Sequence, residues 1–257
     1  MREALKMLGL GPHLEILSMA DLPSNTGLGS SGSFTVGLLL ALHAFKRESI
    51  DAQRLAEEAF HIEAELLGDP VGKQDQYIAA FGHVTEMTID PEGAVMARRI
   101  DLDPRVQEQL ENETLLFYTG IKRDASEVLS SQQASLTQHK TDVVGSLHEI
   151  KQIGQQVTHA LSSGDLTSFG KLLDQHWQSK KGTSTLMTTS DIDRWYACGL
   201  ANGALGGKLM GAGGGGFLMF YCPNDCKPRV RQALNAEGLQ EMRFAIDDDG
   251  AKVIVNL

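Results

Sequence analysis

The chain is poor in cysteine and lacks any long hydrophobic run. Its three cysteines, Cys198, Cys222 and Cys226, are too few for a disulfide framework, and no second ligand pair follows them to complete a zinc site. The longest apolar run, Val36 to Ala44, is too short to cross a bilayer. Charged residues interrupt the first apolar stretch, so no signal peptide is visible. We therefore expect a cytoplasmic protein.

Positive charge is also scarce. The 257 residues include 23 Lys and Arg against 33 Asp and Glu, which gives a formal net charge of −10. This balance argues against nucleic acid or an anionic membrane as a partner. The hydrophobic fraction of 42% and the charged fraction of 22% are ordinary for a soluble protein of one large domain or two modest ones. An anionic substrate therefore needs a local basic pocket.

Glycine, by contrast, is abundant, and the stretch from Pro23 to Ser33 is especially rich in it. Because Gly27, Gly29 and Gly32 carry no Cβ atom, their backbone amides are free to turn toward an anion. The apolar residues from Phe34 to Phe45 predict a buried helix, so the loop lies at a helix N-terminus, where negative charge is favoured. We predict a phosphate cradle. A turn that only caps a core helix is the alternative.

Two other phosphate-binding designs fit this loop poorly. Its glycines satisfy the dinucleotide fingerprint Gly-x-Gly-x-x-Gly, but Pro23 to Thr26 separate them from the preceding strand, and a helix occupies the place of the second strand. A Walker A loop ends in Gly-Lys-Ser or Gly-Lys-Thr, whereas Gly32 is followed by Ser33 and Phe34. The first design is therefore disfavoured and the second is excluded.

Periodicity predicts an α+β arrangement without regular βαβ alternation. One clear helix spans Asp51 to Leu67, with Leu55, Ala59, Ile62 and Leu66 on one stripe. From Ala125 to Lys181 the pattern changes to that of successive helices, which predicts a domain boundary near residue 125. The other expected helices are 1–8, 34–45, several within 125–181, 191–204 and 227–237, and the expected strands are 14–19, 83–89, 94–100, 114–119, 217–221, 243–246 and 252–255.

Two motifs resemble those of the GHMP kinase family. Pro23-Ser24-Asn25-Thr26-Gly27-Leu28-Gly29-Ser30-Ser31 is similar to its nucleotide-phosphate loop, and Lys208-Leu209-Met210-Gly211-Ala212-Gly213-Gly214-Gly215-Gly216-Phe217 is similar to its C-terminal glycine-rich motif. The resemblance covers nearly the whole chain. It implies a two-domain α+β fold, with a truncated N-terminal part like ribosomal protein S5 domain 2 over 1–125 and a ferredoxin-like C-terminal domain over 126–257.

Weaker marks point within the family to the sugar 1-kinases: Gly72 to Tyr77, Tyr118 to Ala125 and Trp177 to Lys181. The resemblance implies ATP-dependent phosphorylation of the anomeric hydroxyl of a sugar or sugar phosphate. D-glycero-D-manno-heptose 7-phosphate is the leading substrate, in the synthesis of precursors of nucleotide sugars and surface polysaccharide. A fucose- or galactose-type kinase, a non-catalytic nucleotide- or sugar-binding homologue and an inactive fragment are the alternatives. The resemblance leaves open whether the protein forms a homodimer.

The resemblance also assigns the nucleotide and metal sites. Helix geometry of about 100° per residue independently puts Glu63 between Ala59 and Ala56, inside the apolar arc. Glu63 and Ser30 are the expected ligands of Mg²⁺, which typically keeps few protein ligands. A half-buried acid paired with Lys or Arg is the alternative for Glu63. The expected nucleotide-binding residues are Pro23, Gly27, Leu28, Gly29, Ser30, Ser31, Gly32, Lys208, Gly211, Ala212, Gly213 and Gly214.

Asp75 resembles the family's catalytic aspartate in Gly-x-x-Asp-Gln, which implies that it accepts the proton of the anomeric hydroxyl or orients that hydroxyl. An ordinary turn residue is the alternative. The cations Arg123, Lys180 and Lys181 are candidates to bind a sugar phosphate, with solvated surface cations as the alternative. His61, His139 and His176 have no His or carboxylate at the spacing of metal ligands. They are therefore interpreted as surface or packing residues.

One expected element is missing. The family has a first motif far upstream, a strand ending in a basic residue and a Gly-rich turn with Thr-Asp, and this chain has no counterpart. We expect an absent piece on the order of half a small domain. Asp75 then lacks its basic partner, and sheet edges are left unpaired. The chain is expected to be either a fragment with an internal Met1 or a natural short form.

Overall fold

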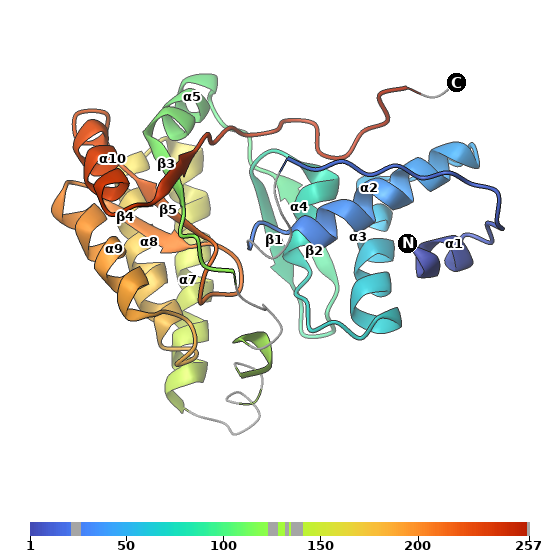
Figure 1. Ribbon diagram of the computed structural model, residues 1–257, viewed down its shortest axis with the longest axis horizontal. Helices are drawn as coiled ribbons and strands as arrows, with labels where there is room; N and C mark the ends of the chain where they lie inside the picture. The colour runs from blue at the N-terminus through green and yellow to red at the C-terminus, as the bar shows by residue number, and fades with distance from the viewer. Residues whose placement is uncertain (22–26, 123–127, 132–133, 135–140, 256–257) are drawn as a thin grey trace. The chain divides into compact units, whose positions relative to one another are not determined.

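The computed structural model describes residues 1–21, 27–122, 128–131, 134 and 141–255. The chain divides into two compact units (Figure 1). Unit 1 comprises Met1–Ser24, Gly29–Arg99 and Ile246–Leu257, and unit 2 comprises Asn25–Leu28 and Ile100–Ala245. The boundary predicted near residue 125 lies outside the described residues and stays a prediction.

Unit 1 packs helices against a two-stranded antiparallel hairpin. Its core joins Val36 and Leu39, Leu55 and Ala59, and Tyr77, which come from three successive helices. The Asp51 side chain caps the second of these helices by accepting a hydrogen bond from the Arg54 amide. The elements are α1 (Arg2–Met7), α2 (Ser30–Phe45), α3 (Ala52–Phe60), the π-helix η1 (His61–Leu66), α4 (Gln74–Phe81), β1 (Thr85–Ile89) and β2 (Val95–Arg99).

The helix predicted over Asp51 to Leu67 forms, but its last turns are a π-helix. The Leu67 amide donates to the Ile62 carbonyl, five residues earlier, which is the π-helical pattern. This wider turn carries Leu66 off the apolar stripe, and its side chain is 44% exposed, so its predicted burial is wrong. Glu63 keeps the inward position that the sequence predicts and is only 3% exposed.

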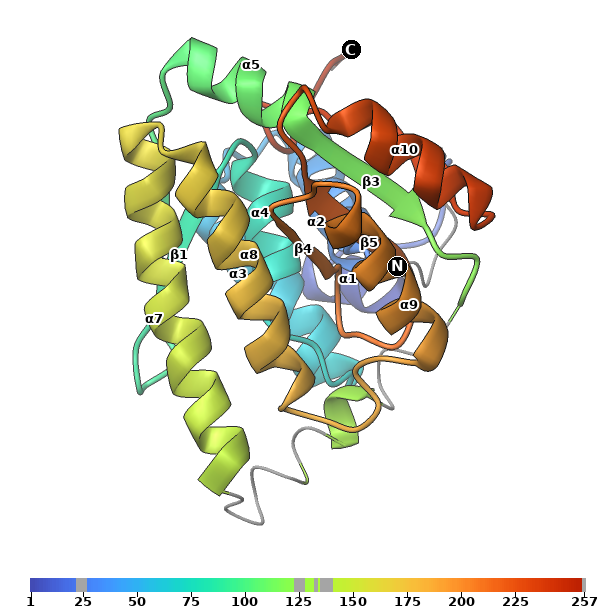
Figure 2. The ribbon, with the colours of Figure 1, turned by 90° about the vertical axis from the view of Figure 1, so that its left-hand side faces the viewer.

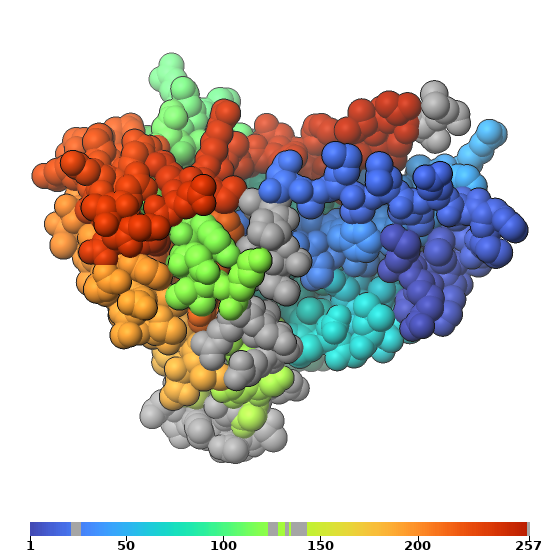
Figure 3. Space-filling model, viewed as in Figure 1, coloured from blue at the N-terminus to red at the C-terminus, as the bar shows by residue number. Residues whose placement is uncertain are grey.

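Three predicted strands are wrong. Segments 14–19, 243–246 and 252–255 are not strands, because none of them has a neighbouring strand among the described residues, and a strand needs a partner for its backbone groups. Side chains in two of them are consequently exposed: Leu17 by 86%, Met19 by 88% and Ile254 by 84%. Figure 3 shows both of these segments on the surface of unit 1.

Unit 2 is built on a four-stranded antiparallel sheet of order β4-β5-β3-β6. Read from the other edge, the first strand of this unit lies between the fourth and the third, which is the ferredoxin-like arrangement. The elements are α5 (Pro104–Glu113), β3 (Thr114–Tyr118), α7 (Thr141–Ser163), α8 (Leu166–Lys181), α9 (Ser190–Ala201), β4 (Gly206–Leu209), β5 (Phe217–Tyr221), α10 (Lys227–Ala236) and β6 (Gln240–Met242).

The core of unit 2 lies between this sheet and its helices. Trp177 of α8, Ile192 of α9 and Val230 of α10 pack with Phe117 and Leu218, which face each other on β3 and β5. Figure 2 shows α7 and α8 as an antiparallel pair. Sequence analysis missed α5, although Asp103 caps it and Pro104 opens it, and it missed the short strand β4. Within the described ranges, no helix is long and apolar enough to span a membrane.

Candidate functional site

The predicted phosphate cradle ends at the N-terminus of α2. Gly29 is the N-cap residue and has a φ of 67°, a left-handed conformation that favours glycine. No side chain caps this helix. Ser30 is half-buried, Ser31 is exposed, and the first-turn amides have no hydrogen-bond acceptor in the described part of the chain. These amides are therefore free to bind an anion.

Asp75 lies directly against this helix start. A Cβ atom added at Gly29 would lie 3.0 Å from the Asp75 Cγ, and one added at Gly32 would lie 3.0 Å from the Asp75 Cβ. The two glycines therefore let the first turn of α4, which carries Asp75, pack against the first turn of α2. Burial raises the pKa of the Asp75 carboxyl, and the negative charge of Glu63 raises it further. A raised pKa makes this carboxylate a stronger base.

Glu63 is the second carboxylate of the candidate site in unit 1. Its Oε2 accepts a hydrogen bond from the Gln76 Nε2, next in the chain to Asp75. The Gln76 Oε1 is buried and has no hydrogen-bond partner among the described residues. Neither Glu63 nor Asp75 has a Lys, Arg or His within 4.0 Å in the ranges that the structure describes. The alternative in which Glu63 serves an ion pair finds no support there.

The candidate site in unit 1 fits a hard cation that binds one protein carboxylate and otherwise phosphate oxygens. The described residues contain no group of three or more His, Cys, Asp or Glu side chains placed to hold a metal ion by themselves. Glu63 supplies a buried anionic oxygen, and the orphaned Gln76 Oε1 beside it is a further hard ligand. These residues suit Mg²⁺ bound together with a nucleotide.

In unit 2, the C-terminal glycine-rich motif forms the turn between β4 and β5. Gly211 has a φ of 70°, and a Cβ atom added to it would lie 2.6 Å from both the Cα and the carbonyl oxygen of Gly27. A Cβ atom added at Gly213, where φ is 113°, would lie 2.3 Å from the Met187 Sδ. Only glycines allow the turn and the loop residue Gly27 to approach this closely. The structure thus joins the two motifs that the sequence separates.

Two lysines stand beside this turn. The Lys180 Nζ on α8 donates a hydrogen bond to the Gly211 carbonyl, with an N···O distance of 2.5 Å. Burial lowers the pKa of Lys180 to about 7, and the charge of Lys208 on β4 contributes. Burial alone lowers the pKa of Lys208 to about 8. Lys181 is placed differently: its Nζ lies 3.7 Å from the Asp193 carboxylate.

The structure therefore brings the predicted residues together in two groups. Pro23 and Arg123 lie outside the described residues. His176, interpreted from the sequence as a surface or packing residue, has its Nδ1 buried without a partner among the described residues. Its spacing of four residues from Lys180 places the two residues on one face of α8. Unit 1 gathers Gly29, Ser30, Gly32, Glu63 and Asp75, and unit 2 gathers Gly27, Lys180, Lys208, Gly211 and Gly213.

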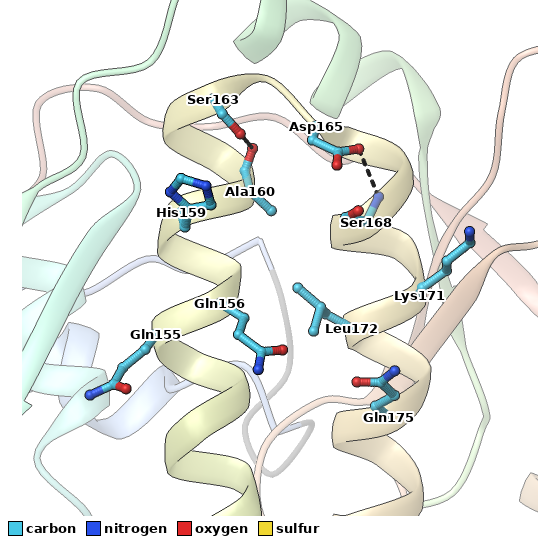
Figure 4. A pocket seen from close by; sticks show the side chains of 10 residues that line it. All are labelled: Gln155, Gln156, His159, Ala160, Ser163, Asp165, Ser168, Lys171, Leu172 and Gln175. Carbon is cyan, nitrogen blue, oxygen red and sulfur yellow. Dashed lines mark hydrogen bonds between the residues drawn. The ribbon is translucent and has the colours of Figure 1, made fainter.

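A separate surface pocket lies between α7 and α8 (Figure 4). Its polar side chains include Gln156 and His159 from α7 and Gln175 from α8, and Asp165 caps the start of α8 by accepting from the Ser168 amide. None of the predicted site residues lines it. We therefore place the candidate site at the glycine-rich elements and not at this pocket.

Comparison with known proteins finds two family models that match the chain. The family model described as "GHMP kinases N terminal domain" matches residues 1–83, and "GHMP kinases C terminal" matches residues 157–239. A curated relative, D-glycero-alpha-D-manno-heptose 7-phosphate kinase of Campylobacter jejuni, is 30% identical over 233 residues, which are 91% of this chain and 68% of the relative. The chain belongs to the GHMP kinases. The resemblance seen in the sequence is confirmed.

Two further relatives of this GHMP kinase chain are sugar kinases, and others are mevalonate kinases. A solved D-glycero-D-manno-heptose 1-phosphate kinase from Bacteroides thetaiotaomicron is 27% identical, with a TM-score of 0.70 over 90% of this chain and 64% of that chain. The galactokinase of Pyrococcus furiosus is 26% identical over 87% of this chain and 68% of its own length. The predicted α+β GHMP kinase fold is confirmed, and the chain spans about two thirds of these relatives. The two family matches leave the boundary between the domains unplaced.

Proposed function

We propose that the chain is an ATP- and Mg²⁺-dependent kinase that phosphorylates the anomeric hydroxyl of a sugar or sugar phosphate. The observation that carries this proposal is the position of Asp75, whose carboxylate lies against Gly29 and Gly32 at the uncapped N-terminus of α2. A base and a set of anion-binding amides are thereby held together. Phosphoryl transfer needs this combination, because positioning and charge stabilisation supply most of its catalysis.

Each residue then has a defined task. When bound, ATP supplies the phosphoryl group and Mg²⁺ offsets its negative charge. The amides at the start of α2 hold phosphate oxygens, and the Ser30 hydroxyl and the Glu63 carboxylate hold the metal. Asp75 accepts the proton of the attacking hydroxyl, and the raised pKa of its carboxyl favours that transfer. Gly27 and Gly211 keep the phosphate loop against the glycine-rich turn.

The proposed acceptor is a heptose phosphate, with D-glycero-D-manno-heptose 7-phosphate first. Support comes from the relatives of Campylobacter jejuni and Bacteroides thetaiotaomicron, whose names specify heptose phosphate substrates. Further support comes from Lys180 and Lys208, which give this acidic chain a local positive charge. The product would serve the synthesis of nucleotide sugars in the cytoplasm, where ATP is abundant.

A coupled assay of ATP consumption tests this proposal. The purified protein is offered hexoses, heptoses and their phosphates, with Mg²⁺ present. We expect turnover that is highest with a heptose 7-phosphate and absent without Mg²⁺. If turnover were highest with galactose or fucose, the proposed kinase activity would stand, but the proposed acceptor would be wrong. No ATP consumption with any sugar would overturn the proposal, and calorimetric binding without product would then indicate a non-catalytic homologue.

A further inference from the structure

Unit 2 holds two half-buried lysine side chains close together. Lys180 of α8 and Lys208 of β4 are near enough for the charge of one to lower the pKa of the other. Among the described residues, neither has a carboxylate within 4.0 Å, and the Gly211 carbonyl is the neutral partner of Lys180. Buried like charges without a counter-charge are costly to a fold. A bound anion would offset the two positive charges.

The acidic side chains around Lys180 are committed to other partners. On the packed helix α7, Glu149 accepts from the Ser179 hydroxyl at 2.8 Å. On α8 itself, Asp174 accepts from the Tyr196 hydroxyl at 2.7 Å. On α9, Asp193 lies beside Lys181. The described acids of each neighbouring element therefore leave the two lysines uncompensated.

A third polar group points to the same place. His176 lies one helical turn before Lys180, and its Nδ1 is buried without a partner in the described part of the chain. Burial lowers the pKa of His176, and together with the charges of Lys208 and Lys180 it brings that pKa to about 3. The imidazole is therefore neutral near pH 7, and its Nδ1 is able to donate or accept a hydrogen bond according to the tautomer.

Lys180 lies next to the predicted phosphate-binding loop. The Lys180 ammonium holds the carbonyl of Gly211, and Gly211 backs directly onto Gly27 of the phosphate loop. All of these residues belong to unit 2. Lys180 therefore bonds directly to the turn that meets the loop, and Lys208 lies on β4, the strand that leads into this turn.

We propose that Lys180, Lys208 and His176 form a binding site for a dianionic phosphoryl group. The site deepens the proposed kinase function and rests on it for the identity of the ligand. Two ammonium groups and one imidazole nitrogen match the oxygens of a phosphate, and charge-assisted hydrogen bonds to it offset the burial of the lysines. The phosphoryl group comes either from the nucleotide or from a phosphorylated sugar, and the two sources are separable by experiment.

Calorimetric titration without turnover tests the site. The variants are Lys180→Met and Lys208→Met, and the control is Lys171→Met on the exposed side of the same helix. The probes are inorganic phosphate, adenylyl imidodiphosphate with Mg²⁺, and mannose 6-phosphate with mannose as its neutral counterpart. We expect each site variant to bind at least one phosphorylated probe about 10- to 100-fold more weakly, which is the effect of losing one charged hydrogen bond. Loss for the nucleotide alone, or for the sugar phosphate alone, identifies the source.

A second measurement separates ligand binding from a structural role. Removal of an uncompensated buried charge should leave the thermal midpoint of the unliganded protein unchanged or higher. A lower midpoint together with unchanged affinity would assign the lysines to the fold and overturn the site. It is also overturned if the wild type binds no probe, or if the site variants bind all probes as the Lys171→Met control does. Turnover with unchanged probe binding would refute only this site, whereas lysine-dependent binding without turnover would refute only the kinase activity.

Discussion

Unit 1 and unit 2 hold partly or fully buried charges of opposite sign, and neither offers these charges a counter-charge among the described residues. In unit 1, the carboxylates of Glu63 and Asp75 share a site with the orphaned amide oxygen of Gln76. In unit 2, the ammonium groups of Lys180 and Lys208 share a site with the orphaned nitrogen of His176. The pKa of Asp75 is raised and those of the lysines are lowered, because burial disfavours the charged form of each.

The difference lies in what the backbone offers to each charge. Asp75 lies in the first turn of α4 and against the first turn of α2, where helix dipoles stabilise a negative group. Lys180 instead meets a backbone carbonyl, that of Gly211. In both units the backbone compensates only partly, so the ligand has to supply the rest. A metal ion suits unit 1 and a phosphoryl group suits unit 2.

The largest expected effect concerns the base in unit 1. Asp75→Asn keeps the size of the side chain but removes the proton acceptor, so kcat should fall by about 100- to 10,000-fold. Asp69→Asn, at an exposed acid of the same unit, should leave kcat unchanged. Steady-state kinetics with saturating ATP measure both. Full activity of Asp75→Asn would show that Asp75 is not the proton acceptor.

The next prediction concerns the metal. Glu63→Gln should raise the Mg²⁺ concentration needed for half-maximal activity by at least about 10-fold, because a metal ligand loses its charge. Glu65→Gln provides a matched control in the same π-helix, since Glu65 is exposed and bonds to His61. Titration of activity with Mg²⁺ gives both values. An equal Mg²⁺ requirement in the two variants would remove Glu63 from the metal site.

A steric prediction probes the junction of loop and turn in unit 2. Gly211→Ala places a Cβ atom against the Gly27 backbone, so it should lower stability and raise the KM for ATP. Gly238→Ala shares the positive φ, at 87°, but has nothing within 4 Å of the added atom. It should show only the backbone strain, about 1–2 kcal/mol. Denaturant unfolding of the two variants should differ, and equal losses would mean that Gly211 and Gly27 do not touch.

The smallest expected effect is a pH dependence of stability. The folded-state pKa of Lys180, about 7, lies below the ordinary 10.5, so the unfolded chain binds more protons between these values. The free energy of unfolding should therefore rise with pH above about 7, and Lys208, whose pKa is about 8, acts in the same direction. Lys180→Met should flatten this rise by about 2–4 °C in Tm for each kcal/mol of penalty removed.

This measurement should stop near pH 9.5, because burial raises the pKa of Tyr196 and of Tyr221, and both oppose the trend at higher pH. His176 titrates below this window. Differential scanning calorimetry of the wild type and Lys180→Met gives the comparison. Parallel curves for the two proteins would mean that Lys180 is not buried as an uncompensated charge.

Local pattern was sufficient for much of this protein. Most helices, although not α4 and α5, and the buried strands β3 and β5 follow from periodicity. The inward position of Glu63 follows from helix geometry alone. The two glycine-rich motifs were also evident, because a backbone that must approach an anion or another backbone requires glycine at particular positions. Segments that look like strands, such as 14–19, failed because pairing is a property of the neighbour and not of the segment.

The family, the α+β class and the residue types available for phosphoryl transfer are evident from sequence alone, because they are carried by short contiguous motifs and local periodicity. Which charges lie close together depends instead on the packing of distant segments. Lys180 and Lys181 are adjacent in sequence, yet one bonds to Gly211 and the other lies beside Asp193, because successive helical residues point about 100° apart. The contact of Gly27 with Gly211, far apart along the chain, likewise arises only from packing.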